Sequence, residues 1–291
     1  MEFGIHAFVW TEGRTQDALE TAMDRARAAG FGLFEFPGLD PKVIDIDRLA
    51  KHAAKLDLKV VASAGLTPAH DVTSSDPEIA PRGEAFLNEA VSVARDLGSS
   101  QLSGPIFSAH QKFSDLPTET GWRTSADVLA RVAERAKAGG VALCLELVNR
   151  YETNLINTVK QGVAYIGDTG SDNIFLHIDT FHMNIEETDQ AQAIRYAGEH
   201  IGYVHVGENH RGHLGTGAID FAPVFDALID IGYTKHVSVE AFDSRALGDP
   251  LKATCAIWRD LWDDADAFAR HSKAFLDLQY AEALRRTAAY A

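Results

Sequence analysis

Short apolar runs alternate along this chain with longer segments in which apolar residues recur every three or four positions. The short runs have the length of strands and are rich in Val, Ile and Leu, which is typical of strands buried on both faces of a parallel sheet. The longer segments have the periodicity of amphipathic helices. Eight strands are expected, near Phe3–Val9, Gly32–Phe36, Lys59–Ser63, Ser100–Ser103, Val141–Glu146, Ile174–Asp179, Gly202–Val206 and His236–Glu240.

Helical segments between these strands give a repeating strand–helix order. The clearest are Thr15–Ala29, Ile46–Leu56, Arg82–Leu97, Thr124–Ala138, Thr158–Gly167, Ile185–Glu199 and Phe221–Ile231. Strands that alternate with helices predict an α/β protein with a parallel sheet, and eight is the number of strands that closes as a (β/α)8 TIM barrel. A doubly wound open sheet is the alternative. It is disfavoured because no Gly-rich phosphate loop follows the first strand.

The C-terminal part departs from this order. From Leu251 to Tyr290 the pattern is largely helical and longer than one barrel helix requires. It indicates either a barrel helix with a second helix packed beneath it, or a surface for contact between subunits. We therefore expect one TIM-barrel domain over residues 1–291, with a C-terminal helical extension from about residue 251 that contributes to an oligomer. Its apolar stripe would consist of Ile257, Leu261, Phe268, Phe275, Leu276, Tyr280 and Leu284.

Composition and charge exclude several classes of protein. The 291 residues are 46% hydrophobic and 24% charged, which is ordinary for a globular protein with a large core. With 42 acidic and 27 basic side chains the formal charge is −15, which argues against a surface for nucleic acid or for an anionic membrane. The N-terminus lacks the features of a signal peptide, and no run reaches the roughly 18 apolar residues of a membrane span.

The two cysteines, Cys144 and Cys255, do not form a C-x-x-C pair. Each is expected to be a buried free thiol, which fits a reducing cytosol and a cytoplasmic protein.

Four apolar runs lead directly into a residue that can bind a metal ion: Val141–Leu145 into Glu146, Ile174–Ile178 into Asp179, Ile201–Val204 into His205 and Val237–Val239 into Glu240. The carboxyl ends of parallel strands gather on one rim, where active sites of α/β proteins lie. Three carboxylates and one imidazole suit Mn²⁺, Mg²⁺ or Co²⁺ better than a closed structural zinc site. Any one of these residues is as well explained as a polar cap at a strand end, so the evidence lies in the set. Four protein ligands would leave an octahedral ion two positions for adjacent substrate oxygens.

Two loops near these ligands carry further candidates. His182 follows Asp179 by three residues and can contact a metal-bound ligand, although the same run also has the features of a helix N-terminus. Both interpretations can hold together. Arg211 lies six residues past His205 on a Gly-rich loop, where it is either a donor to a polar substrate or a surface arginine.

A second carboxylate, Glu152, lies six residues after Glu146. It could accept a hydrogen bond from a substrate hydroxyl. A salt bridge with Arg150 or another basic residue is an equally weighted alternative.

Together these motifs resemble the ketose 3-epimerases, the group of D-tagatose, D-allulose and L-ribulose 3-epimerases within the wider xylose-isomerase-like barrels. The resemblance extends over nearly the whole chain, from F-V-W near the N-terminus to I-W-R-D-L-W late in the sequence. The motifs that carry it are E-L-V-N-R-Y-E, H-V-G-E-N-H-R, V-E-A-F and above all the long run D-T-F-H-M-N-I-E-E.

The resemblance implies a metal-dependent (β/α)8 barrel that forms a homo-dimer or homo-tetramer and uses Mn²⁺ or Co²⁺, with no organic cofactor. By motif, the metal ligands would be Glu146, Asp179, His205 and Glu240, and the first and last of these would also be the catalytic acid–base pair. Glu152, His182 and Arg211 would hold the sugar. His6 and His110 stand where some members carry aromatic residues, while Trp10 and Phe242 match a hydrophobic wall. The departures bear on the preferred ketose and not on the reaction.

The mechanistic hypothesis is epimerisation of a free ketose at C3. The metal would bind O2 and O3 and stabilise a cis-enediolate. One glutamate would remove the C3 proton and the other would return a proton to the opposite face. The reaction would be reversible and would need no redox cofactor.

Three alternatives remain at this point. An aldose–ketose isomerase of the hydroxypyruvate-isomerase type would use a similar site, but the run D-T-F-H-M-N-I-E-E favours the epimerase. Endonuclease-type phosphodiester hydrolysis would require a multi-zinc cluster and a basic face, against which the charge of −15 argues. A non-catalytic sugar-binding protein would not need both Glu146 and Glu240.

Overall fold

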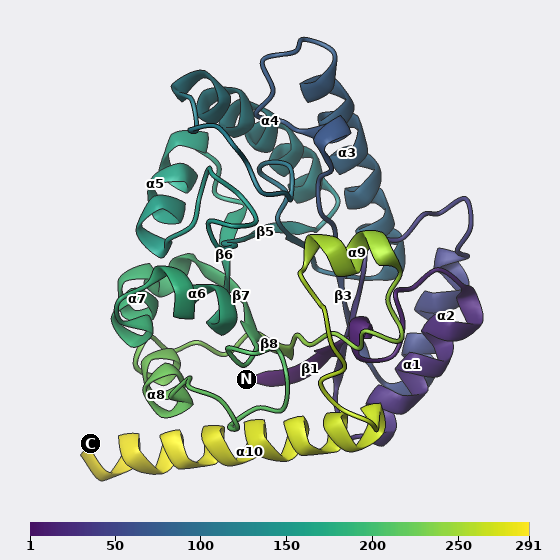
Figure 1. Ribbon diagram of the computed structural model, residues 1–291, viewed down its shortest axis with the longest axis vertical. Coiled ribbons are helices and arrows are strands. Elements are labelled where there is room, and N and C mark those ends of the chain that lie inside the picture. The colour runs from purple at the N-terminus through teal and green to yellow at the C-terminus, as the bar shows by residue number, and fades with distance from the viewer. Residues whose placement is uncertain (291) are drawn as a thin grey trace.

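The computed structural model describes residues 1–290 and contains a closed barrel of eight parallel strands in the order β1 to β8 (Figure 1). This confirms the predicted TIM barrel and rules out the doubly wound open sheet. The strands are β1 (Glu2–His6), β2 (Leu33–Phe36), β3 (Lys59–Ser63), β4 (Gln101–Gly104), β5 (Ala142–Glu146), β6 (Ile174–Asp179), β7 (Ile201–Val206) and β8 (His236–Val239). Every residue of β2, β4 and β7 is buried, as expected for strands covered on both faces.

Helices surround the barrel on its outside (Figure 1). The α-helices of residues 1–290, of which α9 lies over one end of the barrel, are α1 (Gln16–Ala28), α2 (Ile46–Leu56), α3 (Ile79–Leu97), α4 (Glu119–Ala138), α5 (Val159–Thr169), α6 (Thr180–Glu186), α7 (Gln190–Ala197), α8 (Phe221–Asp230), α9 (Asp249–Thr254) and α10 (Ala265–Tyr290). Short 3₁₀ helices occupy Ala7–Val9, Pro68–His70 and Gly198–His200. Within residues 1–290, each helix is too short or too polar to span a membrane.

Local signals in the sequence explain where several helices begin and end. Thr15, Asp45 and Thr158 each accept a hydrogen bond from a backbone N–H in the first turn of α1, α2 and α5. At the other end, α3 terminates at Gly98, whose φ of +85° is accessible to glycine at little cost.

The first strand is shorter than the sequence pattern predicts. It ends at His6, and the chain continues as a 3₁₀ turn over Ala7–Val9. The imidazole explains this turn, because Nδ1 of His6 accepts a hydrogen bond from the backbone N–H of Phe8 at 3.1 Å. At the other end of the barrel sequence, β8 stops at Val239, so Glu240 directly follows the strand.

The single helix predicted over residues 185–199 is wrong, since two helices, α6 and α7, occupy this region. The backbone of Glu187 is extended, and its side chain accepts a hydrogen bond from the N–H of Val159 at 2.7 Å. Two residues later, Asp189 caps the start of α7 by accepting from the N–H of Gln192. These two side-chain contacts favour a break that the apolar periodicity does not indicate.

The C-terminal segment also differs from expectation, because its two helices lie on different sides of the barrel. The short helix α9 crosses the carboxyl-end face of the barrel (Figure 1) and contributes Leu251 and Thr254 to a cavity there. The long helix α10 packs against α8 and β1 and so serves as the eighth barrel helix. There is thus a short helix above the barrel, and not a second helix beneath a barrel helix.

Most of the predicted apolar stripe is used inside the subunit. Phe268 and Leu276 are fully buried, and the ring of Phe268 stacks on Trp262 with a centroid distance of 4.0 Å. Leu284, in contrast, is 45% exposed. The stripe therefore mainly fixes α10 to its own barrel.

We expect Leu276→Ala to lower the free energy of unfolding by about 2–5 kcal/mol, because it opens a cavity in a fully buried contact. Leu284→Ala on the same helix is the matched control, with an expected change of about 0.5 kcal/mol or less for a half-exposed side chain. Urea denaturation followed by circular dichroism measures both. Equal losses in the two variants would contradict the described packing of α10.

Candidate metal centre and active site

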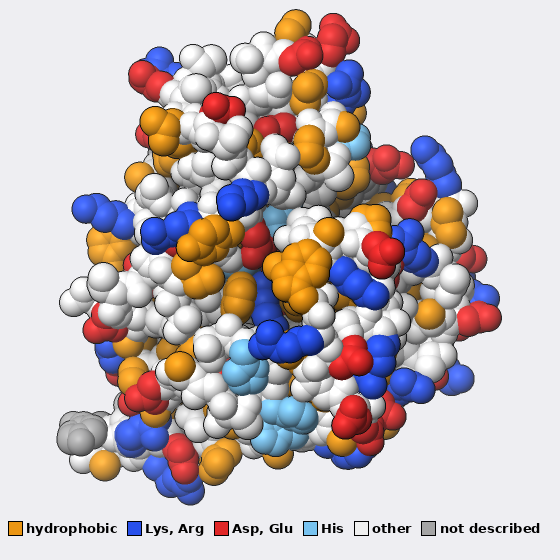
Figure 2. Space-filling model, viewed as in Figure 1, with side chains coloured by type: hydrophobic (Ala, Val, Ile, Leu, Met, Phe, Trp, Pro, Cys, Tyr) orange, Lys and Arg blue, Asp and Glu red, His pale blue; other side chains and the backbone are white. Residues whose placement is uncertain are grey.

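A cavity of about 430 Å³ opens at the carboxyl ends of the strands. Figure 2 shows this face with a hollow near its middle, in which acidic and basic side chains lie between hydrophobic ones. Its lining comes from strand ends, from the loops that follow them and from α9. The position is the one expected for the active site of a parallel barrel.

Four buried ligand candidates converge at the carboxyl ends of the strands, and three of them, Glu146, His205 and Glu240, line the cavity. Glu146, Asp179 and His205 are in the ends of β5, β6 and β7, and Glu240 directly follows β8. One possible ligand atom from each of the four lies within 4.8 Å of the others. Nδ1 of His205 is 3.8 Å from a carboxylate oxygen of Glu146 and 3.8 Å from one of Glu240. The strand-end residues of the sequence pattern thus form one cluster.

The donor set fits a divalent metal ion. Three buried carboxylates carry more negative charge than the one neighbouring guanidinium, that of Arg211, can balance. Nδ1 of His205 is buried and has no hydrogen-bond partner among the described residues, so in the neutral imidazole its lone pair is available to a metal. A second possible grouping of Glu146, His177 and His205 offers only one carboxylate and therefore favours a divalent cation less.

Arg211 lies inside the site and not on the surface, since it is only 5% exposed. Its Nη1 donates to Oδ2 of Asp179 at 3.2 Å and to Oε2 of Glu240 at 2.5 Å. The guanidinium carbon also lies 3.7 Å from the ring centroid of Phe181. The φ of Arg211 is +62°, a left-handed conformation that non-glycine residues rarely adopt.

The Gly-rich loop around Arg211 is organised by a buried carboxylate. Glu208, fully buried, accepts hydrogen bonds from the backbone N–H groups of Gly215 and Ile219 at 3.0 and 3.2 Å. These bonds tie the loop down at its far end, so its strained residue is held over the site. The loop therefore positions Arg211.

The two glutamates have opposite protonation preferences. Burial, and then the charge of Glu240, raise the pKa of Glu146 above its ordinary value. Burial would also raise the pKa of Glu240, but Arg211 and His205 outweigh it and lower that pKa. The protein's own groups therefore shift the pKa values of the two glutamates in opposite directions.

His182 presents a proton to the cavity. Its Nδ1 accepts from the backbone N–H of Asn149 at 3.2 Å, and burial lowers the pKa of the ring. A neutral imidazole that accepts at Nδ1 must carry its proton on Nε2. Nε2 lies 3.6 Å from Glu146 and 3.7 Å from Asp179, so its N–H can reach an oxygen held beside these carboxylates.

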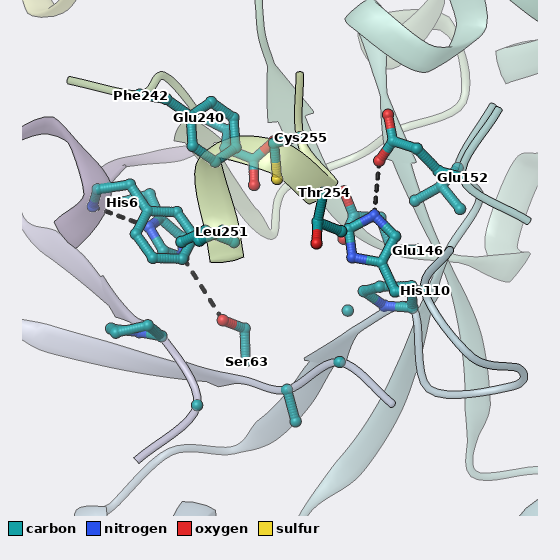
Figure 3. Close-up of a pocket in the computed structure, with 18 of the residues that line it drawn as sticks. His6, Ser63, His110, Glu146, Glu152, Glu240, Phe242, Leu251, Thr254 and Cys255 are labelled. Atoms are coloured by element: carbon teal, nitrogen blue, oxygen red, sulfur yellow. Dashed lines mark hydrogen bonds and ion pairs between the residues drawn. The ribbon is translucent and has the colours of Figure 1, made fainter. Parts of the chain in front are cut away.

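Glu152 pairs with His110 and not with Arg150. Its Oε2 is 2.7 Å from Nε2 of His110 (Figure 3), and its Oε1 accepts from the side-chain amide of Asn149 at 2.7 Å. Arg150 instead pairs with Glu186. The long loop after β4, which carries His110, thus holds Glu152 toward the cavity that both residues line.

The His110–Glu152 pair shifts the pKa values of both residues. Burial would lower the pKa of His110, but its hydrogen bond to Glu152 raises it. Burial would raise the pKa of Glu152, yet His182 and His110 hold it at about 2. Because the pKa of His110 is higher in the folded than in the unfolded protein, its protonated form stabilises the fold. This stabilisation is complete below the unfolded pKa of about 6.5 and is lost as the pH rises through the folded pKa. The pKa of Glu152 is instead lower in the folded protein, so its ionised form stabilises the fold. This stabilisation is complete above the unfolded pKa of about 4.3 and is lost as the pH falls toward the folded pKa.

We therefore expect His110→Gln to lower the free energy of unfolding most between about pH 4.5 and 6.5, by about 1.5–3 kcal/mol. The difference from wild type should shrink at higher pH as the histidine deprotonates. Urea unfolding of both proteins at pH 5.5 and at pH 9 measures it. A difference that is the same at both pH values would contradict the charged pair.

The predicted pocket wall is built partly from other residues than expected. Phe242 lines the cavity, with Phe8 stacked on it at a centroid distance of 5.3 Å. Trp10 is not among the described lining residues. Its indole N–H instead donates to Asp266 of α10 at 2.8 Å. His6 does line the cavity, and its Nε2 lies 3.5 Å from the hydroxyl of Ser63 (Figure 3).

Several residues of the site are not indicated by the sequence pattern. Glu35 in β2 is fully buried, and its carboxylate accepts a hydrogen bond from His205. A charged residue within the apolar run L-F-E-F was the available signal. Leu251, Thr254 and Cys255 reach the cavity from α9 and its end, and no sequence signal indicated that this segment crosses the barrel.

Known proteins resemble this chain along almost all of its length. Residues 23–264 match the family model of the xylose isomerase-like TIM barrel. The chain is 51% identical over 283 residues to the L-ribulose 3-epimerase of Mesorhizobium japonicum, covering 97% of this chain and 95% of that protein. It is 41% identical over 276 residues to a ketose 3-epimerase of Arthrobacter globiformis, with coverage of 95% and 96%. The crystal structure of D-allulose 3-epimerase from Methylomonas sp. in complex with D-allulose is similar with a TM-score of 0.93 at 39% identity, covering 96% of this chain and 97% of that one.

Proposed function

The chain belongs to the ketose 3-epimerases of the xylose isomerase-like TIM barrel family, and from this premise we propose that it epimerises free ketoses at C3 with a divalent metal ion. The observation that carries the proposal is the pair Glu146 and Glu240. Both line one cavity, both belong to the ligand cluster, and their pKa values are shifted in opposite directions. Their positions can be followed in Figure 3.

The metal would be held by Glu146, Asp179, His205 and Glu240. When bound, it would polarise the substrate carbonyl and offset the negative charge that develops on deprotonation. We propose Mn²⁺ as the ion, with Co²⁺ or Mg²⁺ as alternatives of the same ligand preference.

The proton transfers belong to the two glutamates. Glu240, whose lowered pKa keeps it ionised, can accept the C3 proton of one epimer, which leaves an enediolate. The raised pKa of Glu146 suits it to deliver a proton to the opposite face of C3. In the reverse direction the roles exchange, so the overall reaction consumes no proton and needs no redox cofactor.

Neighbouring residues are proposed to hold the sugar. The Nε2–H of His182 can donate to a substrate oxygen beside Glu146 and Asp179. Arg211 fixes the carboxylates of Asp179 and Glu240, and Glu152 can accept from a substrate hydroxyl. His6 and Phe242 line the same cavity and are proposed to contact the rest of the sugar.

An unphosphorylated sugar fits this cavity better than a sugar phosphate. Among the described residues that line it, Arg211 is the one lysine or arginine, and its Nη1 is engaged by Asp179 and Glu240. A phosphate group would find no other permanent cation there. The preferred ketose is proposed to belong to the L-ribulose, D-allulose, D-fructose and D-tagatose class.

The test is incubation of Mn²⁺-loaded protein with each of these four ketoses in D₂O, followed by NMR. Deuterium at C3 together with the C3 epimer is the expected result, and the relative rates rank the substrates. Deuterium at C1 with an aldose product would identify an isomerase of the hydroxypyruvate-isomerase type instead. Sugar binding without hydrogen exchange would identify a non-catalytic binding protein.

We also propose that the protein is a homo-dimer or homo-tetramer, as the family resemblance implies. Light scattering coupled to size-exclusion chromatography gives the mass directly. A monomer mass at the concentrations of the activity assay would contradict this proposal without affecting the proposed reaction.

A further inference from the structure

Glu35 is a buried carboxylate that the proposed reaction does not use. It lies in β2, is fully buried, and is outside the cluster of four metal-ligand candidates. Burying a carboxylate costs several kcal/mol unless other groups compensate, so its position in an otherwise apolar strand requires an explanation.

One oxygen of Glu35 receives two hydrogen bonds. Oε2 lies 2.7 Å from Nε2 of His205 and 2.7 Å from the hydroxyl of Tyr203, two residues earlier on β7. The other oxygen, Oε1, has no hydrogen-bond partner among the described residues and lies 4.0 Å from Nε2 of His6. Glu35 therefore connects one strand of the barrel to the imidazole of a proposed metal ligand.

This contact determines which nitrogen of His205 faces the cluster. A carboxylate accepts hydrogen bonds, so in the neutral form of the imidazole that can bind a metal the proton lies on Nε2, toward Glu35. Nδ1 then keeps its lone pair, and Nδ1 is the atom that lies 3.8 Å from both Glu146 and Glu240. Nδ1 has no hydrogen-bond partner of its own among the described residues.

We infer that Glu35 is a positioning residue for metal binding, which holds His205 in the orientation and tautomer that present Nδ1 to the ion. The inference rests on the metal dependence in the proposed function. A carboxylate hydrogen-bonded to a ligating imidazole also makes the ring a more basic ligand. Loss of such a contact typically weakens metal binding by about 10–100-fold although every direct ligand remains.

A role of Glu35 in packing alone would have a different signature. Tyr203 and His205 donate to the same oxygen of Glu35 at the same distance. If Glu35 only filled the core, removal of either Tyr203 or His205 as a donor would lower the stability of the metal-free barrel. If it positions His205, the His205 contact affects metal affinity and the Tyr203 contact affects it much less.

The experiment measures Mn²⁺ affinity by isothermal titration calorimetry on protein stripped of metal. Glu35→Gln, which keeps the size of the side chain and removes its charge, is expected to weaken Mn²⁺ binding by about 10–100-fold. Tyr203→Phe is the matched control and should have a smaller effect. Circular dichroism and the melting temperature of each metal-free variant report whether the barrel is intact.

A double-mutant cycle tests whether Glu35 affects Mn²⁺ affinity through His205. In a His205→Ala background, Glu35→Gln should change Mn²⁺ affinity no further, because its effect is transmitted through that ring. Wild-type affinity in Glu35→Gln, or an undiminished loss in the His205→Ala background, would overturn the inference. A protein that binds Mn²⁺ as described but does not exchange the C3 hydrogen of any ketose would contradict the proposed function and leave the role of Glu35 standing.

Discussion

Replacing either Glu146 or Glu240 by Gln is expected to slow ketose epimerisation by about 10²–10⁴-fold, the usual contribution of a general acid or base. Glutamine retains the size of the side chain and one oxygen donor for the metal, but its amide cannot accept the C3 proton. Both side chains are buried in the ligand cluster, so solvent water is poorly placed to substitute for either. The rate of C3 epimer formation, followed by NMR, measures the loss.

Exchange of the C3 hydrogen with solvent, measured apart from epimerisation, shows which face of C3 each glutamate serves. With one glutamate intact, the epimer whose C3–H faces it can still lose that hydrogen and regain deuterium on the same face. Each variant should therefore exchange the C3 hydrogen of one epimer only, and the two variants should prefer opposite epimers. Wild-type epimerisation in either variant would contradict the two-base scheme.

Glu134→Gln on α4 is the matched control, because Glu134 is exposed and does not line the cavity. It should epimerise ketoses at the wild-type rate. Mn²⁺ content and circular dichroism of all three variants separate the loss of a base from the loss of metal or fold.

The strand-end residues of the cluster could be predicted because the barrel topology brings the ends of separate apolar runs together. In a parallel barrel the residue that ends each apolar run lies at one rim, whatever the lengths of the loops between strands. Glu146, Asp179 and His205 are therefore brought together by topology alone. Glu240 follows the same logic although it lies one residue beyond its strand.

The strand-end rule does not predict residues that lie inside the barrel or on segments that cross its face. Glu35 acquires its role only because β2 places it within hydrogen-bond distance of His205, a contact between residues 170 positions apart. Cys255 reaches the cavity because α9 crosses the barrel face, which periodicity does not encode for so short a helix. Because the chain turns after His6, Phe8 lines the cavity whereas the indole N–H of Trp10 donates to Asp266 of α10.

Removal of the metal is expected to abolish turnover, and addition of Mn²⁺ should restore it. The two glutamates can transfer protons only from a carbon whose acidity is raised, and no described lining residue other than Arg211 carries a permanent positive charge toward the substrate carbonyl. Prolonged dialysis against a chelator, with metal content checked by mass spectrometry, prepares the sample. The C3 exchange assay before and after addition of Mn²⁺ measures the effect.

The metal-free protein should remain folded but less stable. Arg211 stays paired with Asp179 and Glu240, which limits repulsion among the buried carboxylates. Mn²⁺ at 100 times its dissociation constant should then add about 2.7 kcal/mol to the free energy of unfolding, since it binds the folded state. Asp179→Asn removes one charged ligand without touching either base, so it should lose most of this Mn²⁺-dependent stabilisation, whereas Glu134→Gln should keep all of it. Turnover by protein shown to be free of metal would contradict the role of the ion even if the fold and both glutamates were intact.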